Sequence, residues 1–272
     1  MKWAPRSPIG VVALLVVLAW AAAALLAPVL APYPPGRIVT RDSLAQISVA
    51  FPLGTDYLGR DMLSRVLFGA RYTLGIPLLS ASLACAMGVA LGLTAAARGG
   101  WFDMVTSRVL DAMISVPSLL AALVVVSALG SSIKVLILMA AVIYVPGAYR
   151  LSRAMAVNIN AMDFVAVARA RGERTLYIVW AELLPNMILP VLTDFGLRFV
   201  FVVLLLTGMS FLGLGIQPPD ADWGTLVREN LEGLSFGAPA VIMPALAIAT
   251  LTVSVNGLID HLPGIRPAED VR

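Results

Sequence analysis

Few side chains in this sequence are suited to covalent or metal chemistry. The chain has one cysteine, Cys85, and one histidine, His261, so it cannot supply the four ligands of a structural zinc site. A disulfide within the chain is excluded as well. A Walker A loop needs a lysine directly after a glycine, but the two lysines, Lys2 and Lys134, follow other residues. We therefore expect no metal centre, no bound cofactor and no ATP site of this type in the chain.

The sequence GMSFLG, residues 208–213, has some likeness to a hydrolase motif. A nucleophile elbow requires a glycine two positions after the serine, but Leu212 stands there after Ser210. The single histidine lies at the far end of the last apolar segment, so Ser210 also lacks a nearby base. These departures argue against an intramembrane hydrolase and favour a chain that is not an enzyme.

Composition indicates that the chain folds in a lipid bilayer. Hydrophobic residues make up 60% of its 272 positions and charged residues 13%, and the mean hydropathy is +0.91. Such values are far from those of soluble domains. The formal net charge is only +3 and the arginines are scattered, which argues against a nucleic-acid-binding face. We predict an integral membrane protein.

Six apolar segments are candidates for membrane-spanning helices. A helix needs about 20 apolar residues to cross a hydrocarbon core of about 30 Å. The first segment is too long for the apolar part of a signal peptide, so we expect a retained anchor. The predicted spans are Ile9–Leu30, Tyr72–Ala97, Ala112–Ile133, Val135–Tyr149, Met187–Ile216 and Leu234–Ile259. The predicted fold is therefore all-α and polytopic, with six transmembrane helices.

The distribution of lysine and arginine predicts the orientation. If the N-terminus is cytoplasmic, eleven basic residues lie inside and seven outside, as the positive-inside rule favours. The inner set includes Lys2, Arg6, Arg266 and Arg272. Most of the outer arginines come from one segment, residues 37–71. We predict that both termini are cytoplasmic.

The stretch from Asp163 to Asn186 is charged and helix-like, yet it lies between two apolar spans. Gly172 in its middle and Pro185 near its end predict a helix, a break at the glycine, a second helix and a stop at the proline. On the second helix one apolar face is expected from the spacing of Leu176, Trp180, Leu183 and Leu184. This face suits either lipid headgroups or the groove of a cytosolic partner.

This stretch resembles the coupling loop, or EAA loop, of bacterial ABC-importer permeases. The likeness rests on the triplet Ala166-Val167-Ala168, on Gly172 and on Leu184-Pro185. Asp163 stands where relatives usually have glutamate, and Val167 replaces an alanine. The resemblance implies that a cytoplasmic coupling loop, residues 161–186, contacts an ATPase. The residues implied are Asp163, Ala166, Val167, Ala168, Arg169, Gly172, Leu184 and Pro185.

Two further stretches resemble the dipeptide, oligopeptide and nickel permeases. They are PLGTDYLGRDMLSRVLFGAR, residues 52–71, and SFLGLGIQPPDADWG, residues 210–224. The likeness is to the subunit with the shorter outer loop, and it covers nearly the whole chain. It divides the chain into a terminal tip with the first helix (1–31), an outer segment with the PLGTDxLGRD motif (32–71) and a core permease domain (72–272).

The resemblance implies a role in import. In that family two six-helix permeases form one pathway in the inner membrane, two cytosolic ATPases bind ATP and magnesium, and an external binding protein delivers the substrate. The resemblance therefore implies a heterodimer with a second permease, and peptides as cargo. Nickel complexes or another small solute remain open, as does a membrane scaffold that transports nothing.

Several intramembrane residues are candidates for packing or for the pathway. Close packing along the second span is expected from residues four apart, which are Ser80, Ala84, Gly88, Gly92 and Ala96. Asp194 and Arg198, one helical turn apart, either line the pathway or neutralise each other. Kinks that bear on alternating access, or passive bends, are expected at Pro117, Pro146, Pro190, Pro239 and Pro244.

A short amphipathic helix is expected on the outer side, after Pro218-Pro219. Its apolar residues are Trp223, Leu226, Val227 and Leu231. It suits either the membrane surface or a docked binding protein.

Overall fold

The computed structural model describes residues 7–261. In this range the regular elements are helices, with two isolated β-bridges, Ile38–Arg60 and Thr55–Asp61. The first half of the chain contains α1 (Pro8–Leu30), α2 (Met62–Arg98), α3 (Gly100–Ile114), α4 (Ser118–Leu129) and α5 (Ile133–Asn160). The second half contains α6 (Asp163–Ala170), α7 (Thr175–Tyr177), a π-helix (Ile178–Leu183), α8 (Leu184–Phe211), α9 (Trp223–Glu229), a 3-10 helix (Leu231–Phe236) and α10 (Pro239–Asp260). Lys2, Arg6, Arg266 and Arg272 of the predicted inner charges lie outside the described residues.

Five helices are long and apolar enough to cross a membrane, and a bent pair brings the number to six. The five are α1, α2, α5, the continuous run Thr175–Phe211, and α10. The sixth candidate is α3 with α4, which meet at 85°. The prediction of an all-α polytopic fold is therefore confirmed.

The third predicted span, Ala112–Ile133, is broken at Pro117, one of the prolines where a kink is expected. Helix α3 ends at Ile114 and α4 begins at Ser118, with Pro117 as the N-cap. A residue before proline is disfavoured in helical geometry, and Val116 occupies that position. The apolar run therefore divides into two helices at the proline.

The predicted stop at Pro185 is wrong. The chain stays helical through this residue, because α8 begins at Leu184 directly after the π-helix Ile178–Leu183. A proline ring clashes with the carbonyl four residues earlier, here that of Ala181 inside the π-helix. Single π-turns are known places where a helix absorbs such an interruption.

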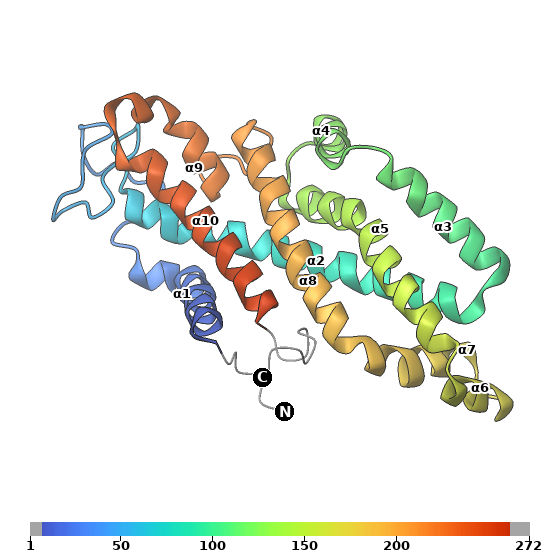
Figure 1. Cartoon of the computed structure of the whole chain (residues 1–272). Helices are drawn as coiled ribbons and strands as arrows, with labels where there is room; N and C mark the ends of the chain where they lie inside the picture. Colours follow the sequence, from blue (N-terminus) through green and yellow to red (C-terminus); the bar gives the residue numbers. More distant parts are fainter. Residues whose placement is uncertain (1–6, 262–272) are drawn as a thin grey trace.

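Helix α2 runs through the centre of the bundle and contacts α5 more extensively than any other pair of elements do (Figure 1). The predicted packing residues all lie on buried faces: Ser80, Ala84, Gly88, Gly92 and Ala96. At Gly92 an added Cβ would lie 2.9 Å from the amide nitrogen of Arg153. At Gly88 it would meet Cβ of Ala148. The absence of side chains at these two glycines lets the backbones of α2 and α5 approach closely.

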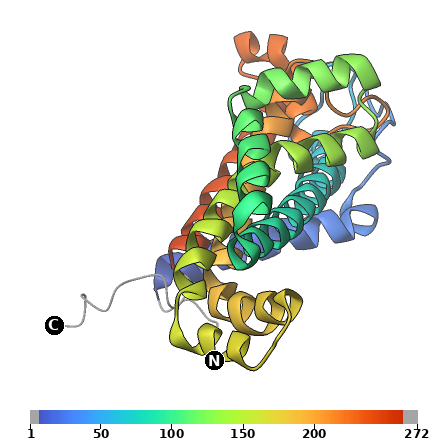
Figure 2. The same cartoon turned by 90° about the vertical axis from the view of Figure 1, so that its right-hand side faces the viewer.

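The two ends of the bundle carry different structures. Helices α6 and α7 lie together at one end, and α9 lies at the other beside the non-helical segment before α2 (Figures 1 and 2). We call residues 32–61 together with α9 the cap. The coupling loop, residues 161–186, therefore lies at the end of the molecule away from the cap.

Candidate functional site

The coupling loop is fixed to the bundle through one buried face. Val165 and Ala168 of α6 are fully buried. From the second part of the loop, Ile178, Val179 and Leu183 are buried in the same cluster. They pack against residues of α2 and α5, which are Val89, Leu93, Ala96, Ala97 and Ala156. Movement of the loop is thus coupled mechanically to the ends of α2 and α5.

Arg169 adds hydrogen bonds to this attachment. Its Nη2 atom donates to the carbonyl oxygen of Ala97 at 2.9 Å and to Oδ1 of Asn160 at 2.8 Å. Nδ2 of Asn160 in turn donates to the carbonyl oxygen of Ala96 at 3.0 Å. A cation near the C-terminus of a helix is favourable, because the last carbonyls carry partial negative charge. Arg169, which the resemblance implies as an ATPase-contact residue, therefore forms hydrogen bonds to α2 and α5 of its own chain.

Gly172 forms the turn between the two parts of the loop. Its φ of +86° is in the left-handed region, which glycine adopts without steric cost. Its N–H donates to the carbonyl oxygen of Arg169 at 2.9 Å. An added Cβ would meet no atom within 4 Å, so glycine is required here by backbone conformation and not by space.

The opposite face of the loop exposes large apolar side chains. Leu176 is 69% exposed and Trp180 60%, next to a hollow lined by both of them, Gly172, Glu173, Arg174 and Tyr177. The exposed apolar face comprises Phe164, Val167, Leu176, Tyr177 and Trp180. The other predicted contact residues are Asp163, Ala166 and Pro185, which are exposed, and Leu184, which is half-buried.

The predicted apolar face of the second loop helix is therefore wrong. Leu176 and Trp180 point outward, whereas Leu183 is fully buried. The π-helix from Ile178 to Leu183 changes the number of residues per turn. Residues that share a face at the spacing of an α-helix consequently separate onto two faces.

At the other end of the bundle, a buried ionic network fixes the cap. Nη1 of Arg65 lies 2.7 Å from Oδ2 of Asp56 and 2.7 Å from Oε2 of Glu229. Arg60 contacts the same two carboxylates, at 2.5 Å and 3.3 Å. The four side chains are at least nine-tenths buried. Three of these residues come from the PLGTDYLGRD stretch or just after it, and Glu229 comes from α9.

The glycines of this motif shape its turns. Gly54 and Gly59 have φ values of +73° and +74°. A side chain at Gly54 would collide with the carbonyl oxygen of Ala45, and one at Gly59 with that of Thr40. Asp61, at the end of the motif, caps α2 by accepting from the N–H of Ser64 at 2.8 Å. The motif therefore encodes a compact loop, two buried ionic residues and a helix start.

Helix α9 lies in the interior of the cap and not on a surface. Trp223 and Leu226 are fully buried, whereas Leu231 is exposed. Nε1 of Trp223 donates to the carbonyl oxygen of Val66 at 2.9 Å, and its ring meets that of Trp20 with centroids 4.7 Å apart. The apolar face of α9 therefore packs against α1 and α2. It lies neither on the membrane surface nor under a docked protein, which were the two predicted alternatives.

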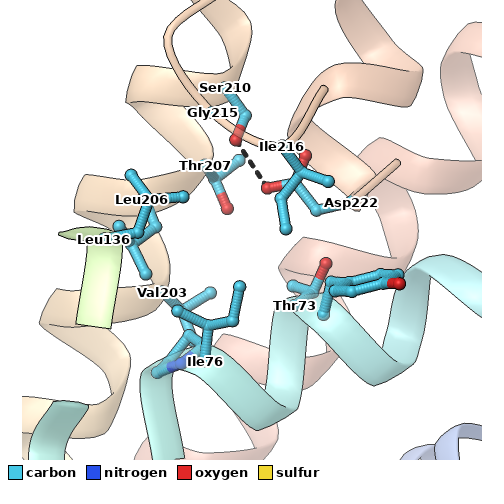
Figure 3. Close-up of a pocket in the computed structure, with 12 residues that line it drawn as sticks. Thr73, Ile76, Leu136, Val203, Leu206, Thr207, Ser210, Gly215, Ile216 and Asp222 are labelled. Carbon is cyan, nitrogen blue, oxygen red and sulfur yellow. Dashed lines mark hydrogen bonds between the residues drawn. The ribbon is translucent and has the colours of Figure 1, made fainter. Parts of the chain in front are cut away.

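Asp222, the N-cap of α9, is buried beside a small cavity of about 10 Å³ (Figure 3). Its Oδ2 accepts from Oγ of Ser210 at 2.6 Å, and its Oδ1 accepts from the N–H of Thr225 at 2.9 Å. Burial raises the pKa of this carboxyl above its usual range. Ser210 of the GMSFLG stretch thus ties α8 to the cap, and it serves as a hydrogen-bond donor.

Residues 88–263 match the family model described as binding-protein-dependent transport system inner membrane component. The chain belongs to this family. It is 34% identical over 253 residues to the di/tripeptide transport system permease protein DppC of Pseudomonas aeruginosa. This alignment covers 91% of the chain and 82% of the relative. It is 29% identical to the dipeptide permease DppC of Alkalihalophilus pseudofirmus, over 99% of the chain and 88% of the relative. It is 32% identical to the glutathione permease GsiD of Pectobacterium atrosepticum, over 97% of the chain and 87% of the relative.

The predicted resemblance to permeases of ABC importers is thereby confirmed. The chain is a multi-pass component of the inner membrane in a binding-protein-dependent transport system, and it is a transport permease. The system implied by the family includes further ABC components. The family match begins at Gly88 in α2 and includes the whole coupling loop, whereas the cap lies partly outside it.

Within the spans of this permease, Asp194 and Arg198 form a closed pair on α8, which α5 covers. Nε and Nη2 of Arg198 lie 2.6 Å and 2.8 Å from the two carboxylate oxygens of Asp194. Nη1 of Arg198 donates to the carbonyl oxygen of Tyr144 at 3.2 Å. Both side chains are 10% exposed. This geometry is that of a pair in which each charge neutralises the other.

A second set of charges joins α3 to α5 in the permease, and sequence reasoning missed it. Nη2 of Arg150 lies 2.6 Å from Oδ1 of Asp111. One to two turns away, Arg153 pairs with Asp103, and the hydroxyls of Ser107 and Tyr149 are 2.7 Å apart. Asp103, Ser107 and Asp111 are four residues apart, a spacing that indicates one polar helix face. This spacing is the feature of the sequence from which a polar contact face on α3 could have been predicted.

Proposed function

We propose that the chain is one of two permease subunits of an ATP-driven importer of peptides. The relatives named above carry the names of dipeptide, di/tripeptide and glutathione permeases, and these substrates share a peptide backbone. In this proposal a second, different permease completes the pathway, and an external binding protein delivers the peptide. ATP and magnesium bind to two partner ATPases and not to this chain.

The observation that carries the proposal is the two-sided coupling loop. One side is buried against α2 and α5, and the other exposes Phe164, Val167, Leu176, Tyr177 and Trp180. Exposed large apolar side chains that include aromatic residues are typical of protein interfaces. We infer that this face enters a cleft on an ATPase. Closure of the ATPases would then move the ends of α2 and α5, because the loop and these helices form one packed unit.

This role requires the coupling loop to be cytoplasmic and the cap to be external. The count of basic residues supports the same orientation. It is tested with single cysteines in a Cys85→Ala chain, placed at Asp163 in the loop and at Gln217 before α9, which are both exposed. Asp163→Cys should react with an impermeant thiol reagent only from the cytoplasm, and Gln217→Cys only from outside. Reversed labelling contradicts the proposed role of the loop.

Contact with the ATPase is tested by cross-linking in the complete transporter. Val167 is exposed and Val165, two residues earlier on the same helix, is fully buried. We expect Val167→Cys, in the Cys85→Ala background, to cross-link to an ATPase subunit through a short bifunctional reagent, whereas Val165→Cys does not. Peptide uptake by the Cys85→Ala transporter is measured in parallel. Equal cross-linking at both positions, or none at Val167, contradicts the proposed docking.

A further inference from the structure

The ion pair between Asp111 and Arg150 differs from the Asp194–Arg198 pair because it is open to its surroundings. Arg150 is bonded through Nη2 at 2.6 Å and Nε at 3.0 Å, and both bonds use Oδ1 of Asp111. The side chain of Arg150 is 54% exposed and that of Asp111 48%. Oδ2 of the carboxylate takes part in neither bond, so it is available to a further donor.

The location of this pair excludes lipid as its neighbour. Asp111 lies eleven residues from the start of α3 and Arg150 ten residues from the end of α5. At about 1.5 Å per residue both are about 15 Å from the helix ends near the coupling loop. Exposed charges at such depth face water or protein, because hydrocarbon does not solvate them. The face of α3 and α5 that carries the pair therefore borders water or another subunit in the assembled transporter.

An apolar cavity of about 630 Å³ lies between α3, α4 and α5 near the pair. Its volume is in the range of small-molecule sites. Met113 and Ile114 of its wall come two and three residues after Asp111, and Ile143 precedes Arg150 by seven residues, two turns along the same helix face. The remaining wall residues include Val116, Pro117, Ala121, Val125, Leu138 and Val142. The two charges thus lie within two helical turns of wall residues on both α3 and α5.

We propose that this cavity and the Asp111–Arg150 pair form a transit site for peptides with free termini. This inference rests on the proposed function. The α-ammonium of the peptide takes the place of the guanidinium at Asp111, and its α-carboxylate binds the released Arg150. An extended dipeptide spans at most about 7 Å, so a small separation of the two side chains admits it. Side chains of the peptide contact the walls, which are apolar except for Ser118 and Tyr144.

The pair is suited to transit and not to tight binding. Its charges remain hydrated when they are paired, so exchanging one partner for a peptide terminus changes the number of ionic contacts little. A pathway site must bind well enough to receive the substrate and weakly enough to release it. The closed Asp194–Arg198 pair, with one bidentate interaction of two hydrogen bonds and 10% exposure, lacks this property.

Protection of a cysteine in the cavity wall tests the site while leaving both charges in place. The protein is the complete transporter without the binding protein, in liposomes, with a Cys85→Ala chain carrying Val142→Cys. Val142 lines the cavity and is exposed. We expect dialanine to slow the labelling of Val142→Cys by a small thiol reagent. N-acetyl-dialanine amide, which has no charged terminus, should need at least about tenfold higher concentrations, as expected for loss of one charge-assisted bond.

The matched control is Val124→Cys, an exposed residue of α4 outside the cavity wall. Dialanine should not protect it. Asp111→Asn and Arg150→Gln, each combined with Val142→Cys, should remove the difference between the two peptides. Asp103→Asn, which changes the neighbouring pair, should keep the difference. Equal protection by the charged and the blocked peptide, or no protection by dialanine, overturns the transit site.

Uptake of dialanine by the unmodified transporter with its binding protein separates this inference from the proposed function. If dialanine enters but does not protect Val142→Cys, the transit site is wrong and the peptide importer stands. If ATP-dependent uptake of dialanine is absent, both the proposed peptide substrate and the transit site fail.

Discussion

The cap and the coupling loop are both held against the same bundle, but by opposite means. In the cap, four charged side chains are buried together and join residues before α2 to α9. In the coupling loop the buried contacts are almost entirely apolar, with Arg169 and Asn160 at the edge, and large apolar side chains remain exposed on the other face. The charged side chains of the cap network are all buried, whereas the loop leaves one apolar face exposed, which we call its free face.

This difference shows how each region responds to change. Buried charges are strongly position-dependent, because each needs its partners at short distance and none can be solvated after a partner is lost. An apolar contact tolerates small displacement, and an exposed apolar face gains stability from a partner. We therefore expect substitutions in the cap to affect folding, and substitutions on the free face of the loop to affect association.

The largest effect is expected for Arg65→Met in the cap. Asp56 and Glu229 then share one remaining arginine, and loss of one member of a buried ionic network costs about 3–5 kcal/mol. The amount of protein in the membrane and its thermal midpoint in detergent should both fall. Arg41→Met, at an exposed position of the same segment, is the control and should behave as wild type. Normal stability of Arg65→Met would show that the network is not what closes the cap.

Gly172→Pro should abolish peptide uptake with a smaller effect on folding. Proline cannot adopt the φ of +86° and lacks the N–H that bonds to Arg169, and the local strain is about 1–3 kcal/mol. Gly172→Asn is the matched control, because asparagine tolerates the left-handed region. Uptake is measured in reconstituted transporters with equal amounts of protein. If Gly172→Pro transports as well as Gly172→Asn, the geometry of this turn is irrelevant to coupling.

Trp180→Ala should separate association from stability. Trp180 is exposed, and an aromatic residue at the centre of an interface typically contributes about 2 kcal/mol, or about 30-fold in affinity. We expect weaker binding of the ATPase in a pull-down titration and an unchanged thermal midpoint. Val179→Ala, at the adjacent buried position, should instead lower the midpoint, because it removes buried methyl groups. The reverse pattern would mean that the free face of the loop is not an interface.

The smallest effect is expected for Ser210→Ala. This change removes the hydroxyl that donates to Asp222 at 2.6 Å, and a hydrogen bond of this kind contributes about 1 kcal/mol. The thermal midpoint should fall slightly while uptake persists. Ser127→Ala, whose hydroxyl bonds only to a carbonyl of its own helix, provides the baseline. A loss of uptake at normal stability in Ser210→Ala would assign Ser210 a role in transport beyond the attachment of the cap.

Much of the architecture could be predicted from hydropathy alone. The number and order of the apolar segments, and the charged interruption between Asp163 and Asn186, follow from the length that a bilayer demands. Helix ends were less predictable. Pro117 divides its segment and Pro185 does not end its helix, although both are prolines in helical patterns. The difference lies in the π-helix before Pro185, which local sequence does not announce.

The sites divide in the same way. Gly172 was recognisable, because a glycine between two helical patterns marks a turn whatever surrounds it. The faces of the second loop helix were not, because burial there depends on a π-turn and on contact with α2. The charged contacts of Arg150 could not be paired in advance, since Asp111 is 39 residues away in the sequence.

The sequence by itself determined that this chain spans a membrane, in which order its helices form and where the coupling loop begins. These properties depend on hydrophobicity and backbone propensity, which act over a few residues to about 20. Only the tertiary structure decided which charges are closed and which are open. Asp194–Arg198 and Asp111–Arg150 are both carboxylate–arginine pairs, but α5 covers the first, whereas the side chains of the second are about half exposed. Solvation of a charge depends on everything packed around it, and that is a property of the whole fold.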